Sequence, residues 1–368
     1  MSNVTDDTLS SIKTPVQGPV ILLPMDYSRR LQNISDRYNP DKSTIIEQRM
    51  YSAERSYDRD VAKYVLRAMC AVDEEYTKKT KDAGEAAKQH LSSQLSKVSF
   101  EYQGSVMTDT HIRGASDIDL LVVCEKFYGT DILKVREELQ RSWKYDYVQQ
   151  GRLQRFDSSF SSYQGDSLRD LRELRMSIES IMSSNYSICD VSRPKSVKIT
   201  NQHLHRDVDV VTSSWFQSLD YILNGMPMEK RGICIFNKDM NREEGPDYPF
   251  LSIFRINNKS AESQGRLKRM IRFMKNIRTD SEKEIPLNSF EINAICYSIP
   301  VWEYASMDYR AMVNLLWQRL YHLWRDGKCD DLVSVVGDEF VFKGKPEKVQ
   351  ALKDLEDEVY RINQDLNK

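Results

Sequence analysis

The spacing of apolar residues changes twice along the chain and predicts three parts. Residues 1–42 are polar, and an extended or partly ordered leader is indicated because any regular pattern is interrupted by Pro15, Pro19, Pro24 and Pro40. Residues 43–257 mix helical spacing with the alternation of strands, whereas residues 258–368 show helical spacing. We therefore expect a leader, a mixed lobe and a helical C-terminal lobe.

The mixed lobe begins with helical spacing and continues with short apolar strands. A long helix is expected over residues 43–79, with Ser43 as its N-cap, and a second helical stretch leads to about Leu95. Beyond it we expect helices over residues 130–149 and 167–184, a Ser/Gly-rich loop over 151–165, and strands over 98–102, 117–123, 197–199, 204–211 and 232–236.

The helical lobe is expected to contain helices over residues 261–279, 288–299, 306–326 and 345–366. The fold class that follows is α/β (α+β), with two lobes, a mixed sheet and a long N-terminal helix.

Composition narrows the class of protein and its location. The 368 residues carry a formal net charge of only -2, so a global basic field of the kind that binds long nucleic acid is absent. The six cysteines contain no CxxC pair, which favours reduced thiols over a disulfide framework. Neither a signal-type apolar region nor a membrane-length run is present, so we expect a cytoplasmic protein without a membrane partner.

Two acids at the start of one strand give the first chemical signal. Side chains alternate across a strand, so Asp117 and Asp119 share a face while Ile118 points the other way. Such close carboxylates repel each other unless a cation lies between them. Gln103, Gly104 and Ser105 form a small-residue turn just upstream, whose backbone can approach a phosphate. The sequence therefore predicts divalent-metal binding beside a phosphate-binding turn.

A third acid follows about ninety residues later on another apolar strand. Three acids on neighbouring strands suffice to hold two magnesium ions, one activating a hydroxyl and one holding a triphosphate. Asp207 and Asp209 share a face by alternation, so periodicity leaves the choice between them open.

Basic and histidine side chains are the other candidates. Lys268, Arg272 and Lys275 fall on one face of a predicted helix, where they can face phosphates or simply solvent. His203 and His205 form a weak pair that favours ordinary strand histidines over zinc ligands. They therefore add no metal site to the acids.

The spacing of Gly104-Ser105, Asp117-Ile118-Asp119 and Val208-Asp209-Val210-Val211 resembles the polymerase-β-type nucleotidyltransferase superfamily. Within it the chain is most similar to the bacterial cGAS/DncV-like nucleotidyltransferases (CD-NTases), over roughly residues 45–330. After Gly104-Ser105 the chain departs from many members, because residues 106–110 replace an Ala-Arg-Gly-Thr-like continuation.

The resemblance implies a role for each matching residue. Asp117, Asp119 and Asp209 match the metal ligands, and Gln103, Gly104 and Ser105 match the turn that holds the donor triphosphate. Lys268 and Ser289 match its contacts from the second lobe, and Phe290 matches an aromatic that stacks on a base, although a core position is equally compatible with its sequence context.

The resemblance also implies an activity and its partners. We expect an enzyme that uses two Mg²⁺ or Mn²⁺ ions to join nucleoside triphosphates into a cyclic or linear oligonucleotide second messenger, with release of pyrophosphate, in bacterial anti-phage signalling. The partners would be the nucleotides and a downstream effector that senses the product, and we expect a monomer. Two alternatives stay open: transfer to another acceptor, such as an RNA 3′ end, an antibiotic or a protein, and a catalytically silent nucleotide sensor.

Overall fold

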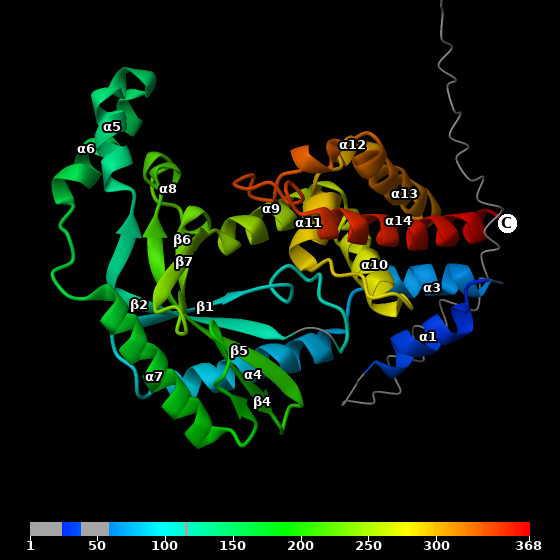
Figure 1. Ribbon diagram of the computed structural model, residues 1–368, viewed down its shortest axis with the longest axis horizontal. Helices are drawn as coiled ribbons and strands as arrows, with labels where there is room; N and C mark the ends of the chain where they lie inside the picture. Colours follow the sequence, from blue (N-terminus) through cyan, green and yellow to red (C-terminus); the bar gives the residue numbers. More distant parts are fainter. Residues whose placement is uncertain (1–23, 38–58, 115–116) are drawn as a thin grey trace, which may run out of the picture.

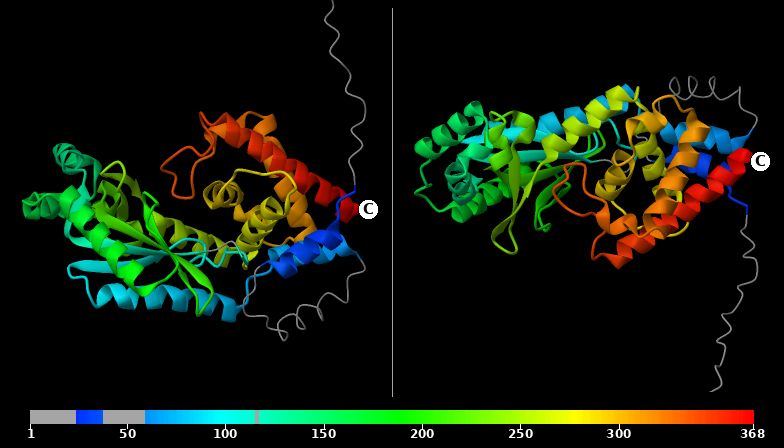
Figure 2. Two further views of the ribbon diagram at one scale, coloured as in Figure 1. Left: turned by 60° about the horizontal axis from the view of Figure 1, so that its bottom comes forward. Right: turned by 90° about the horizontal axis from the view of Figure 1, so that it is seen from above.

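The computed structural model describes residues 24–37, 59–114 and 117–368, which form two lobes along the long axis of the molecule (Figure 1). One lobe contains the sheet and the other is helical, and Figure 2 shows them side by side from two further directions. Helix α9 (Pro249–Glu262) leads from the sheet lobe into the helical lobe (Figure 1). The predicted two-lobed α/β fold is confirmed.

In the described residues, seven strands form one mixed sheet. They are β1 (Val98–Gln103), β2 (Ile118–Thr130), β3 (Cys189–Asp190), β4 (Ser196–Asn201), β5 (Arg206–Gln217), β6 (Gly232–Asn237) and β7 (Arg242–Asp247). The order is β1-β2-β5-β4-β3, with β6 pairing both β5 and β7. Strands β2 and β5 run parallel and all other pairs are antiparallel.

Two long helices cover one face of this sheet. Helices α4 (Glu74–Ser92) and α7 (Ser167–Asn185) pack on the apolar residues of β2 and β5, including Ile118, Leu120 and Val208. Helix α4 approaches closely, because a Cβ atom added at Gly84 would lie 2.9 Å from the Tyr102 ring. Since strand residues alternate, burying Ile118 against helices directs Asp117 and Asp119 to the opposite face.

The second face of the sheet is apolar further along the strands. There Leu121, Val123 and Val211 pack with Trp215 beneath Phe250 of α9. The acids lie beyond this cluster, at the starts of β2 and β5, so α9 covers the apolar part of the face and leaves their end of the sheet next to the helical lobe.

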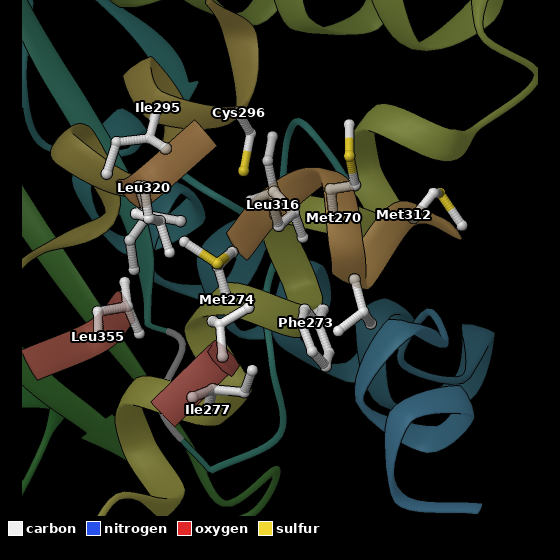
Figure 3. Close-up of a cluster of buried hydrophobic side chains, with 14 of the residues drawn as sticks. Met270, Phe273, Met274, Ile277, Ile295, Cys296, Met312, Leu316, Leu320 and Leu355 are labelled. Carbon is white, nitrogen blue, oxygen red and sulfur yellow. The ribbon is translucent and has the colours of Figure 1, made fainter. Parts of the chain in front are cut away.

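The helical lobe is built around α10 (Arg266–Asp280), most of whose residues are buried. Figure 3 shows Met270, Phe273, Met274 and Ile277 of α10 meeting side chains from the helices around it. Those helices are α11 (Ser289–Tyr297), α12 (Val301–Tyr304), α13 (Tyr309–Arg325) and α14 (Pro346–Asn367), with α1 (Tyr27–Asp36) and α3 (Asp60–Met69) on the other side.

Several predicted boundaries were wrong. Of the helix expected over residues 43–79, residues 43–58 lie outside the described part; α3 then ends at Met69, and α4 begins at Glu74 behind its N-cap Asp73. Helix α1 is an ordered element within the segment expected to be an extended or partly ordered leader. The predicted loop over residues 151–165 is largely helix α6 (Tyr147–Ser159), which packs against α5 (Ile132–Gln140) and α8 (Leu219–Leu223).

Within the residues that the structure describes, there is no helix whose length and apolar character would suit a membrane crossing.

Candidate active site

Four side chains form a row across the acid face of the sheet. Gln103 of β1 pairs with Asp119 of β2, Asp119 pairs with Asp209 of β5, and Asp209 pairs with Lys198 of β4. Directly paired residues share a face and lie within reach of each other. The row therefore brings two of the predicted metal ligands, Asp119 and Asp209, next to Gln103, the first residue of the predicted phosphate-binding turn.

Lys198 links Asp117 and Asp207, which lie two residues before Asp119 and Asp209. Its Nζ donates to Asp117 Oδ2 at 2.6 Å and forms an ion pair with Asp207 Oδ2 at 2.8 Å. Thr200 Oγ1 donates to the other Asp207 oxygen at 2.7 Å. Both oxygens of Asp207 are thus bound by side chains of β4, and Asp207 lies two residues before Asp209 on β5.

Asp209 has different contacts. Its Oδ1 accepts from Arg193 Nη1 at 3.2 Å and from Ser196 Oγ at 3.3 Å. Because Asp209, and not Asp207, pairs directly with Asp119, the structure favours Asp209 as the third acid.

Asp119 and Asp209 face one another across β2 and β5, and burial together with their mutual repulsion raises the pKa of Asp119. Burial first, and then the charges of Asp209 and Asp117, raise the pKa of Asp119 to about 7. Burial and the charge of Asp117 also raise the pKa of Asp209, against the opposing effect of Arg193 and Lys198. A divalent cation would relieve this repulsion, and carboxylate oxygens are the ligands that Mg²⁺ prefers.

The donor set therefore fits the predicted metal, although the described side chains do not already stand as a group of three or more metal ligands. The side chain of Asp117 is paired with Lys198 in the arrangement seen here. Binding by all three acids would thus require the Asp117 carboxylate to leave the ammonium.

The turn after β1 lies directly beside Asp119. Gly104 has φ +88°, and a Cβ atom added to it would be 2.4 Å from Asp119 Oδ2. The Ser105 carbonyl accepts from Thr110 N at 3.0 Å and from Thr108 Oγ1 at 3.2 Å, which folds the connection into a compact loop. Only glycine combines this backbone conformation with such close approach of a carboxylate.

Helix α10 holds this loop from the other lobe. Arg272 Nη1 donates to the Asp109 carbonyl at 2.6 Å, and Lys275 Nζ donates to the Thr110 carbonyl at 3.0 Å. These side chains are 5% and 2% exposed. The prediction of a basic face directed at a cleft or solvent is therefore wrong for both, because they are buried and hydrogen-bonded to the backbone of the loop.

Lys268 lies about two turns before Lys275 on α10. It is partly buried, and burial lowers its pKa while Asp109 opposes that effect. Lys275 is much more deeply buried, which lowers its pKa to about 7. Of the two lysines, Lys275 is the one that contacts the loop of Ser105 directly.

Ser289 and Phe290 open helix α11. Asn288 caps the helix by accepting from Phe290 N at 2.8 Å, and Glu291 returns a contact to the Asn288 backbone, completing a capping box. Phe290 is 37% exposed, so a core position is excluded and its ring remains available at the surface. His203 and His205 are exposed.

Sequence reasoning missed Lys198 and Arg193. The signal for Lys198 was present, since a lysine between Val197 and Ile199 must point away from the apolar face that these residues bury. Its acidic partners become visible only when the register between β4 and β5 is known.

Known proteins resemble the chain over nearly its whole length. A family model of the cGAS/DncV-like nucleotidyltransferase C-terminal helical domain matches residues 255–364. A c-di-GMP synthase from Lachnospiraceae bacterium is 63% identical over 342 residues, covering 93% of this chain and 99% of that protein. The chain belongs to the cGAS/DncV-like nucleotidyltransferases. The predicted family and enzyme class, a nucleotidyltransferase, are thereby confirmed.

Solved structures of related cGAS/DncV-like nucleotidyltransferases agree with this fold. A STING-associated CdnE c-di-GMP synthase from Capnocytophaga granulosa is 38% identical, with a TM-score of 0.77 and coverage of 93% of this chain and 99% of that chain. A second, from Flavobacteriaceae sp., is 33% identical, with a TM-score of 0.82 and coverage of 93% and 98%. The two-lobed arrangement around the acid row is therefore that of a nucleotidyltransferase.

Replacing Gly104 tests the contact between the turn and Asp119. In this nucleotidyltransferase, Gly104→Ala should lower product formation about 100-fold or more, because displacing a reacting group by about 1 Å has that effect. The measurement is the initial rate of product formation at a saturating concentration of nucleotide. Gly327→Ala is the matched control, since it has φ +66° with nothing within 4 Å of the added Cβ. Equal activity of the two variants would contradict the proposed contact.

Proposed function

We propose that the chain joins two GTP molecules into c-di-GMP and releases pyrophosphate at each of two transfers. Support comes from the relatives described as c-di-GMP synthases, which align with nearly the whole chain. The observation that carries the proposal is the row in which Asp119 and Asp209 pair directly beside the turn at Gly104. Two acids in this position suit metal-dependent nucleotidyl transfer.

Asp117, Asp119 and Asp209 would hold two Mg²⁺ or Mn²⁺ ions. When bound, these ions would neutralise the acids and the triphosphate and lower the pKa of the attacking hydroxyl. Membership of the nucleotidyltransferase family supports Asp209 as the acid nearest that hydroxyl, and Arg193 and Ser196 would hold one of its oxygens on the β4 side. The resting repulsion among the acids would make the site selective for a cation of high charge.

The donor triphosphate would lie between the two lobes. Gln103, Gly104 and Ser105 would approach it with backbone groups from the sheet lobe, while Ser289 at the start of α11 would contact it from the helical lobe. Lys268 would supply positive charge to the triphosphate, while Lys275 would hold the loop in place through its bond to the Thr110 carbonyl. Phe290 would stack on a base.

The reaction then follows from positioning. The ribose hydroxyl oxygen of one nucleotide attacks the α-phosphorus of the other, the bond to the pyrophosphate leaving group breaks, and the hydroxyl proton is lost to the surroundings. The linear product keeps one triphosphate, so a second transfer of the same kind closes the ring. Holding both nucleotides in line accounts for most of the rate enhancement.

The product would act as a signal. Two related structures are described as STING-associated, so we propose a cytoplasmic role in anti-phage defence, with a product-sensing effector as the downstream partner. We propose that the chain acts as a monomer, with residues 43–257 as the catalytic lobe, residues 258–368 as the helical lobe and residues 1–42 as a leader.

The product is tested by incubating the purified protein with Mg²⁺ or Mn²⁺ and each nucleoside triphosphate, alone and in pairs, followed by mass spectrometry. GTP alone should give c-di-GMP, and Asp117→Asn/Asp119→Asn should reduce its formation by at least about 1000-fold, because both metal-ligating charges are lost. Product made only when an RNA, antibiotic or protein acceptor is added, or nucleotide binding without pyrophosphate release, would replace the proposal by the corresponding alternative. Unchanged product from the double variant would reject the site.

Metal binding should depend on pH through Asp119. Its pKa of about 7 means that a proton occupies the carboxylate below that pH and must be displaced by the metal. Apparent Mn²⁺ affinity should therefore rise about tenfold per pH unit up to about pH 7 and level off above it. Calorimetric titration with Mn²⁺ between about pH 5.5 and 8 measures this, with Asp119→Asn as the control that lacks the titrating group. Constant affinity across this range would contradict the role of Asp119.

A further inference from the structure

Lys198 places a positive charge inside the acid site. It lies in β4 between Val197 and Ile199, which are fully buried on the apolar face, so its side chain extends over the acid face. There its ammonium group lies 2.6 Å from Asp117 Oδ2 and 2.8 Å from Asp207 Oδ2. The Lys198 ammonium group thus links Asp117, an expected metal ligand, to Asp207, which has no role in the proposed reaction.

The two acids are held unequally. Asp207 is fixed from a second direction, because Thr200, its direct cross-strand partner, donates to its other oxygen at 2.7 Å. The two side chains are equally exposed, but Asp117 lies immediately before the first residue of β2, whereas Asp207 lies within β5. Asp117 is therefore the partner that can turn away, and Asp207 is the partner with which the ammonium stays.

Metal binding by Asp117 must compete with this ion pair. An ammonium at 2.6 Å engages the carboxylate oxygen that a divalent ion would also use. Lys198 also lies directly opposite Asp209 across β4 and β5, so its positive charge is close to a second expected ligand. Lys198 consequently opposes a cation at two of the three expected ligands.

We propose that Lys198 is a positioning residue: it holds Asp117 in an ion pair until a divalent metal ion binds, and it then releases Asp117 to the metal ion. Asp207 would keep the lysine in place throughout. The inference rests on the proposed function, since it takes Asp117, Asp119 and Asp209 as the metal ligands. Lys198 balances the acids before a metal ion arrives and keeps Asp117 at the edge of the site. Asp207 prevents the lysine from following Asp117 toward the metal.

This arrangement predicts opposite effects for two neighbouring substitutions. Lys198→Met removes the competing cation, so Mn²⁺ should bind about tenfold more tightly, the usual size of the effect of one charge at this range. Asp207→Asn removes the anchor and leaves the ammonium to Asp117, so Mn²⁺ should bind more weakly by a similar factor. Calorimetry or the electron paramagnetic resonance signal of free Mn²⁺ measures both without reference to catalysis.

A double-variant cycle separates anchoring from simple loss of charge. If Asp207 acts through Lys198, the effect of Asp207→Asn should shrink in the Lys198→Met background. An equal effect in both backgrounds, or weaker Mn²⁺ binding by Lys198→Met, overturns the proposal. Lys198→Arg keeps the charge and should restore affinity close to that of the parent protein.

Two further variants keep the test decisive. Lys198→Gln removes the charge but keeps a hydrogen-bond donor, so it should also tighten Mn²⁺ binding if Lys198→Met fails to fold. Asp119→Asn separates this inference from the proposed function: if that variant binds Mn²⁺ like the parent protein, the metal site itself is wrong. Loss of Mn²⁺ binding by Asp119→Asn together with weakened binding by Lys198→Met and Lys198→Gln rejects only the role of the lysine.

Discussion

Mutual repulsion of carboxylates on one face of a sheet is the constraint that organises this structure. Burial of Ile118 and Val208 under α4 and α7 forces Asp117, Asp119 and Asp209 onto the same face, where their charges oppose one another. The fold stabilises this arrangement with cations on β4 and on the preceding segment. Hydrophobic packing thus drives charges together in a way that favours a further cation between them.

The second lobe is tied to this site through one loop. Residues 104–114 lead from the turn beside Asp119 toward the start of β2, and side chains of α10 donate to the carbonyls of Asp109 and Thr110 in this loop. Because α10 is also the centre of the helical core, the position of the loop depends on the packing of that lobe. These hydrogen bonds therefore connect the two lobes beside the proposed nucleotide site.

Much of the site could be predicted from sequence because it follows from alternation within single strands. Alternation shows which residues share a face with Asp119, but it does not give the register between strands about ninety residues apart. The pairing of Asp119 with Asp209 and the contacts of Lys198 depend on that register. The helical face of Arg272 and Lys275 was likewise visible, whereas the loop that it contacts was not.

Local signals were also overridden or overlooked in the fold. Gly151 and the nearby serines suggested a loop, but Asp146 and Gln149 form a capping box and Leu153 and Phe156 are buried, so packing stabilises helix α6 despite its weak propensity. The break before α4 follows from Asp73, which accepts from Tyr76 N as an N-cap.

The central claim is that Asp119 and Asp209 bind a divalent metal ion, and that the third ligand, Asp117, leaves Lys198 to join them. Anomalous diffraction from crystals grown with Mn²⁺ and a non-hydrolysable GTP analogue tests it most directly. The account predicts a peak bonded to Asp119 and Asp209, with Asp117 turned to the metal and Lys198 retained by Asp207. A Mn²⁺ peak elsewhere, or Asp117 still paired with Lys198 beside a bound metal ion, would contradict it.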